Sequence, residues 1–196
     1  MRPDLAFLVG SRICHDLISP IGAISNGVEL LSLTDGDTGA EMELINQSVQ
    51  NANARIRYFR IAFGAAGPQQ PIGRSEVLSI LTAIAKGGRF TYYWQIEGDQ
   101  ERRLVRCALL ILQCFETALP LGGDLQINAD GDAWVLTAEG PRITINDDLW
   151  GSVKRPGNDF AHSAAQVQFA LLPDVIAEAG RTLHLDITSD RITARF

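Results

Sequence analysis

Apolar residues recur at intervals of three, four and five along the first third of the chain, which indicates two long amphipathic helices. The first stripe runs over residues 5–31 and the second over residues 42–63. Residues 34–37 predict a short loop, and Thr38 and Glu41 predict a capping box that opens the second helix. Two such helices joined by a short loop pack antiparallel. A lone hairpin leaves apolar surface exposed, so we expect a second copy to complete a four-helix bundle as a homodimer.

The pattern changes after residue 67, where we place a boundary between a helical domain at 1–67 and a second domain at 68–196. In the second domain, alternation with β-branched or aromatic residues predicts strands, and apolar runs closed by Gly or Pro predict helices. The expected strands are 90–97, 125–129, 134–138, 142–146, 183–188 and 191–196, and the expected helices are 75–86, 101–119 and 160–179. The expected fold class is α+β: a helical hairpin followed by an α/β sandwich with helices on one face of its sheet.

Composition and charge narrow the classes of partner. Hydrophobic residues make up 46% of the chain, enough to bury a core. The net charge of -6 argues against nucleic-acid binding, because no basic excess is available to neutralise phosphates. No uninterrupted apolar run of membrane-spanning length and no signal-peptide pattern occur, so we expect no membrane association. The 3 cysteines lack metal-ligand spacing, which favours a reduced, cytoplasmic compartment and no metal site in this chain.

His15 is the candidate catalytic residue of the first helix. It stands off the apolar stripe, in a column of small polar residues that includes Ser11 and Ser19. A histidine on a helix surface is by itself more often an ordinary solvated residue. The adjacent Asp16, placed to orient the imidazole, and Pro20, five residues further on, favour a functional histidine.

The residues after His15 are candidate partner contacts. Pro20 has no N–H and should bend the helix one turn past the histidine. We expect this bend to open a slot that could hold a partner's helix. The slot would lie between the end of the second helix and the residues that follow His15. The predicted contacts are Ile18, Ser19, Pro20 and Gly22.

Basic residues near His15 could attract an acidic partner. Arg12 lies one turn before Asp16, and the half of the second helix that carries Arg55, Arg57 and Arg60 returns toward His15 in an antiparallel hairpin. We include Arg12 and Arg55 among the candidate partner contacts. A solvated helix face is an equally good interpretation of the three arginines on the second helix.

The run from His15 to Pro20, H-D-L-I-S-P, resembles the H-[ED]-L-x-x-P box that carries the phosphorylated histidine of sensor histidine kinases. The wider run of residues 11–27 resembles ChpT-type histidine phosphotransferases of alphaproteobacteria. This resemblance implies that His15 is phosphorylated. It also implies a dimerising hairpin followed by a domain similar to kinase ATP-binding domains.

The second domain departs from a kinase at three places that would bind ATP. The paired asparagines are absent from 109–118, D-x-G-x-G is replaced at 137–142, and 162–168 has no glycine where a kinase has its flexible lid. Alanine and glutamine do not give the positive φ and close backbone approach that glycine supplies. We therefore expect no bound ATP and no autokinase activity.

The resemblance implies that His15 relays phosphoryl groups between the receiver-domain aspartates of a hybrid kinase and of response regulators, with Mg²⁺ supplied by the receiver. Two alternatives stay open: an ATP-dependent histidine kinase with an unusual nucleotide site, and an adaptor that binds receivers without being phosphorylated. The sequence leaves open the direction of flow, the cognate proteins and the imidazole nitrogen that reacts.

Overall fold

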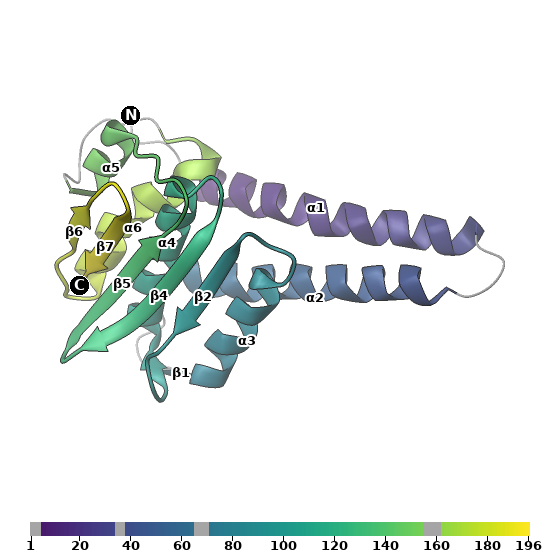
Figure 1. Ribbon diagram of the computed structural model, residues 1–196, viewed down its shortest axis with the longest axis horizontal. Coiled ribbons are helices and arrows are strands. Elements are labelled where there is room, and N and C mark those ends of the chain that lie inside the picture. Colours follow the sequence, from purple (N-terminus) through teal and green to yellow (C-terminus); the bar gives the residue numbers. More distant parts are fainter. Residues whose placement is uncertain (1–4, 34–37, 65–70, 155–161) are drawn as a thin grey trace.

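A computed structural model of the chain describes residues 5–33, 38–64, 71–154 and 162–196. The predicted loop at 34–37 and the domain boundary after residue 67 lie outside the described residues. Two long helices, α1 (Leu5–Leu33) and α2 (Gly39–Ala62), form an antiparallel hairpin. Its far end projects well beyond the rest of the molecule (Figure 1). The predicted hairpin is confirmed.

The start of α2 differs from the sequence prediction. Thr38 makes no side-chain capping hydrogen bond, and one carboxylate oxygen of Glu41, Oε2, is buried without a hydrogen-bond partner. Thr38 has φ -104° and ψ 17°, whereas the capping side chain normally requires an extended backbone at this position. The predicted capping box is therefore wrong.

The two helices approach closely at Gly27, which is buried against α2. A Cβ atom at this position would lie 2.6 Å from Cγ1 of Ile45. At Gly22, which is also in α1, a Cβ atom would meet nothing within 4 Å. Gly27 therefore serves the packing of the hairpin, whereas Gly22 does not.

The rest of the chain forms an α/β sandwich whose main sheet has 5 strands in the order β2-β4-β5-β7-β6. The β2–β4 pair is parallel and the other pairs are antiparallel. The elements are β1 (Pro71–Ile72), α3 (Arg74–Ala85), β2 (Phe90–Trp94), β3 (Gln100–Glu101), α4 (Arg102–Ala118), β4 (Gly123–Asp130), β5 (Ala133–Glu139), α5 (Asp147–Lys154), the 3₁₀ turn η1 (Ala164–Gln166), α6 (Val167–Glu178), β6 (His184–Ile187) and β7 (Arg191–Arg195). The predicted fold class is confirmed.

Alternation along the strands sends one face of the sheet into the core. Leu125 pairs with Ala138, Ile127 pairs with Leu136, and all four residues are buried. The helix α4 covers this face and is buried along almost its whole length. In Figure 1, α4 and α6 lie between the sheet and the base of the hairpin.

The base of α2 belongs to this core. Phe59, Ile61 and Ala62 are buried in the same cluster as α4, and the Tyr58 hydroxyl donates a 2.6 Å hydrogen bond to the Leu109 carbonyl. Apolar side chains at the end of α2 thus pack onto the sandwich rather than facing solvent. The slot for a partner's helix beside this end of α2 stays a prediction.

The segment after β5 corrects a second prediction. Residues 142–146, expected as a strand, belong to no helix or strand. Instead, Asn146 Oδ1 accepts a hydrogen bond from the Leu149 amide and caps α5. Asn followed by two aspartates is a recognised start signal for a helix, and it outweighs the short apolar alternation before it.

By length and composition alone, α1 is also apolar enough to cross a membrane, which the sequence pattern did not predict. A helix that packs on other protein surfaces passes the same test. Several apolar side chains of α1 are exposed in the single chain, among them Ile18, Ile21 and Val28.

Candidate functional site

His15 stands on the surface of α1 with its side chain 83% exposed. Its Nδ1 atom lies 3.0 Å from Oδ1 of Asp16, the next residue. In the tautomer in which Nδ1–H donates to this carboxylate, the lone pair of Nε2 is left free. The geometry thus presents a nucleophilic nitrogen to solvent, away from the carboxylate.

The carboxylate of Asp16 is held from its other side by arginines from both helices. Arg12 Nε donates a 2.7 Å hydrogen bond to Oδ2, and Arg55 Nη1 lies 3.9 Å from the same oxygen. Asp16 is only 12% exposed, so these contacts lie in a partly desolvated setting where charge pairing is effective. Asp16 therefore connects the exposed imidazole to the base of the hairpin.

Arg12 also contacts the segment that precedes and begins α6. Its Nη1 donates to the Ala165 carbonyl at 2.9 Å and lies 3.4 Å from Oε1 of Gln168. Residues 162–168, which the resemblance to kinases aligns with their lid, thus contact α1 through Ala165 and Gln168.

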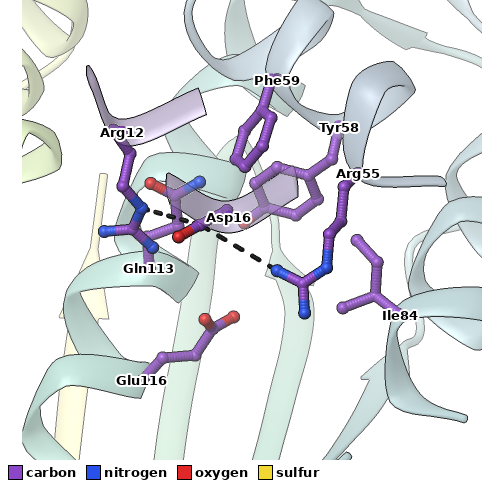
Figure 2. Close-up of a pocket in the computed structure, with 8 residues that line it drawn as sticks. All are labelled: Arg12, Asp16, Arg55, Tyr58, Phe59, Ile84, Gln113 and Glu116. Carbon is purple, nitrogen blue, oxygen red and sulfur yellow. Dashed lines mark hydrogen bonds and ion pairs between the residues drawn. The ribbon is translucent and has the colours of Figure 1, made fainter. Parts of the chain in front are cut away.

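A small cavity lies beneath Asp16, between the hairpin and α4. Figure 2 shows Arg12 and Arg55 reaching toward Asp16 above Glu116. The cavity volume is about 40 Å³, which is room for water but far below the several hundred Å³ of a nucleotide pocket. It is lined by Arg12, Asp16, Arg55, Tyr58, Phe59, Ile84, Gln113 and Glu116.

Glu116 and Tyr92 form the lower part of this site. The Tyr92 hydroxyl donates a 2.8 Å hydrogen bond to Oε1 of Glu116. Burial raises the pKa of Glu116, although the Tyr92 hydrogen bond and the charges of Arg12 and Arg55 act in the opposite direction. Burial and the adjacent Glu116 raise the pKa of Tyr92, so the tyrosine stays a donor. Neither residue was a sequence candidate, because their meeting depends on long-range packing.

The predicted partner contacts are distributed over two environments. Ile18 is 68% exposed and Ser19 is exposed, so both share the surface with His15. Pro20 is buried, and Gly22 is half-buried beside open space. Arg55 lies 3.9 Å from the Asp16 carboxylate, so the half of α2 that carries it returns toward His15; its contact with a partner stays a prediction.

Arg57 and Arg60 do not join the site. Both face Glu76 of α3, at 4.0 Å and 3.5 Å. Arg57 also lies within hydrogen-bond distance of Ser79 on the same helix. Of the three arginines on α2, Arg55 is the one that lies beside Asp16.

The described residues contain no group of three or more His, Cys, Asp or Glu side chains that could hold a metal ion. Gly140, in the stretch 137–142 that the sequence analysis compared with the kinase D-x-G-x-G motif, packs closely against Gly122. A Cβ atom there would lie 2.5 Å from the Gly122 carbonyl oxygen. This glycine therefore has a structural reason to be small, independent of any nucleotide.

Comparison with known proteins identifies the family. Residues 74–191 match the model of the histidine phosphotransferase C-terminal domain. The protein phosphotransferase ChpT of Brucella abortus (strain 2308) is 33% identical over 201 residues, which cover 96% of this chain and 93% of that protein. The solved structure of a bacterial phosphotransferase superposes with a TM-score of 0.81 at 30% identity, covering 100% of this chain and 96% of the other. The chain belongs to the ChpT-type histidine phosphotransferase family.

Proposed function

We propose that this protein is a phosphorelay intermediate that carries a phosphoryl group on His15. The observation that supports this most directly is an imidazole that is 83% exposed yet oriented by a mostly buried carboxylate. Exposure lets a partner's active site reach the ring, and the Asp16 contact selects the nitrogen that reacts. We take the partners to be receiver domains and the compartment to be the cytoplasm.

The transfer step needs only one bond exchange. The lone pair of His15 Nε2 forms a bond to phosphorus, while the bond from phosphorus to the receiver's aspartyl oxygen breaks and its electrons leave with that carboxylate. Asp16 stabilises the positive charge that develops on the ring, and the reverse exchange passes the group to a second receiver. The receiver brings its own Mg²⁺, and Arg12 and Arg55 add positive charge near the approaching acidic surface.

The decisive experiment uses a receiver domain carrying radiolabelled aspartyl phosphate. Incubation with this chain should move the label onto it in an acid-labile, base-stable form. His15→Ala should abolish the transfer. The matched control is His184→Ala, which removes an exposed histidine of β6. Retention of label by His15→Ala would contradict the proposal, and binding of the receiver without any label transfer would favour the adaptor instead.

An ATP-dependent kinase is tested separately. The lid segment is packed on α1 and the cavity beside Asp16 is small, which argues against a nucleotide at this place. Calorimetric titration with Mg²⁺–ADP should give no binding heat. Saturable binding together with label transfer from ATP to His15 would favour the kinase.

The receiver is proposed to dock beside His15 over Ile18, Ser19, Pro20 and Gly22. Gly22 offers a clean test, because a Cβ atom there has open space in the free protein. Gly22→Ala should leave the fold intact and weaken receiver binding. The matched control is Gly10→Ala, a helical glycine with equally open surroundings on another face of α1. Equal receiver affinity in both variants would remove Gly22 from the docking surface.

We also propose that two hairpins pair into a four-helix bundle. The exposed residues Met42, Val49 and Ile56 recur every seven positions on α2, and Ile21 and Val28 do the same on α1. A seven-residue apolar repeat on a helix surface is the pattern of helix–helix packing in bundles and coiled coils. The second copy would cover side chains that the single chain leaves in water.

A further inference from the structure

Gln168 is a fully buried polar residue, 0% exposed, near the start of α6. Its amide nitrogen donates to Thr117 Oγ1 at 3.0 Å and approaches the Gln113 carbonyl at 3.5 Å, both on α4. Because the nitrogen is directed at α4, the amide oxygen is directed at α1. There it lies 3.4 Å from Nη1 of Arg12.

Arg12 transmits this orientation to the reactive histidine. Its Nη1 also donates to the Ala165 carbonyl, and its Nε donates to Oδ2 of Asp16. A guanidinium group is planar, so contacts on two sides of the fork fix its plane. The plane of Arg12 in turn fixes the carboxylate whose other oxygen meets Nδ1 of His15.

The imidazole depends on this support because it is so exposed. With 83% of its side chain in solvent, packing does not define its orientation, and Asp16 is the hydrogen-bond partner described for it. A carboxylate released by Arg12 could rotate toward Arg55 or toward water. The ring would then lose the contact that keeps the proton on Nδ1.

We propose that Gln168, held by Thr117, is a positioning residue for phosphoryl transfer at His15. The inference rests on the proposed function. The inference gives the α/β sandwich a role in the transfer. Gln168, which is 156 positions from Arg12 in the sequence, sets the geometry of the reacting nitrogen of His15. The segment that a kinase uses to close over ATP is used here to orient the histidine.

Two variants test this. Gln168→Leu removes the side-chain amide. Thr117→Val removes only the hydroxyl that accepts the Gln168 hydrogen bond, and Thr117 is itself exposed. If Gln168→Leu does not fold, Thr117→Val decides the test. The matched controls are Gln126→Leu on β4 and Thr82→Val on α3, an exposed helical threonine. Thermal unfolding confirms that each protein is folded.

The first readout is single-turnover transfer from a phosphorylated receiver over a range of receiver concentrations. We expect the rate constant at saturation to fall about 10-fold in Gln168→Leu and Thr117→Val, with an unchanged receiver Kd. The second readout is the ¹⁵N NMR spectrum of His15 in the protein alone. The population of the Nδ1–H tautomer should decrease in both variants and in neither control.

An unchanged rate and tautomer in the folded variants would overturn the proposal. A slower rate with an unchanged tautomer, or a change confined to the receiver Kd, would also overturn it, because the residue would then act on stability or docking. This test can fail separately from the proposed function. Phosphate label on the His15→Ala variant would contradict phosphorylation of His15. If His15→Ala takes up no label but Gln168→Leu transfers phosphate at the wild-type rate, only the positioning role is contradicted.

Discussion

The Nδ1 atom of His15 lies 3.0 Å from Oδ1 of Asp16, although the first side chain is 83% exposed and the second only 12%. The contact joins a ring that a partner can reach to a carboxylate that solvent hardly reaches. In this arrangement one nitrogen is occupied and the other is free. The chemistry of the site follows from this pair more than from any pocket.

Asp16→Asn should slow phosphoryl transfer on the order of 100-fold while the protein stays folded. The amide still fills the space, but it does not stabilise positive charge on the ring and does not balance Arg12. Single-turnover transfer from a phosphorylated receiver measures the effect. Asp174→Asn, which changes an exposed acid of α6, is the control. Full activity of Asp16→Asn would show that the carboxylate charge is dispensable.

Gly27→Ala and Gly22→Ala should have different effects on stability. Both place alanine in α1, and helix propensity alone would favour each by up to about 1 kcal/mol. At Gly27 the new Cβ would lie 2.6 Å from Ile45 Cγ1, whereas at Gly22 it meets nothing within 4 Å. We expect Gly27→Ala to be less stable than Gly22→Ala by about 1–3 kcal/mol in urea unfolding. Equal stabilities would mean that the hairpin is not closely packed at Gly27.

The exposed heptad positions predict how the proposed dimer can be broken. Replacing Val28 and Val49 together by glutamate should give a monomer in light-scattering chromatography, because four charges would enter the bundle core of the dimer. Leu121→Glu, at an exposed leucine of the α/β sandwich, should leave the dimer intact. A monomeric wild-type chain would contradict the bundle, and wild-type protein that floats with anionic vesicles would show that a membrane covers this face instead.

Glu116 predicts a pH dependence of stability. Its pKa is raised in the folded state, chiefly by burial, so the folded state binds the proton more tightly than the unfolded state. The free energy of unfolding should therefore fall as the pH rises above the unfolded value near 4.5, until the folded pKa is passed. The nearby charges are Arg12, Arg55 and Asp16.

Glu116→Gln should remove this fall in the free energy of unfolding with rising pH, because the amide carries no charge and can still accept the Tyr92 hydrogen bond. Urea unfolding between pH 4 and pH 8 measures the free energy of unfolding of both proteins. Relative to wild type, the variant should gain stability at the alkaline end. Glu97→Gln, at a side chain 82% exposed, should follow the wild-type curve. A parallel curve for Glu116→Gln would contradict the raised pKa.

The hairpin, the main sheet and the exposed His15 could be predicted because each rests on a local pattern. Apolar periodicity predicted α1 and α2, and alternation predicted the strands that carry the buried Leu125 and Leu136. The capping box at Thr38 was wrong because the backbone of Thr38 is not extended. The strand at 142–146 was wrong because Asn146 caps α5 instead. Local signals of three or four residues are easily outweighed in this way.

The support beneath His15 could not be predicted from local patterns. Gln168 reaches Arg12 across 156 positions, and Glu116 meets Tyr92 through the packing of α4 on β2. Gln113, Glu116 and Gln168 lie in the ranges 109–118 and 162–168, which the sequence analysis set apart from kinase motifs. In the structure, Gln113 and Glu116 line the cavity beneath Asp16, and Gln168 contacts Arg12.

The measurement that tests the central claim most directly is label transfer from a phosphorylated receiver to this chain, compared between wild type, His15→Ala and His184→Ala. We predict acid-labile, base-stable phosphate on the wild type and on His184→Ala, and none on His15→Ala. Label that persists on His15→Ala, or its absence from a wild-type chain that binds the receiver, would contradict a relay through His15.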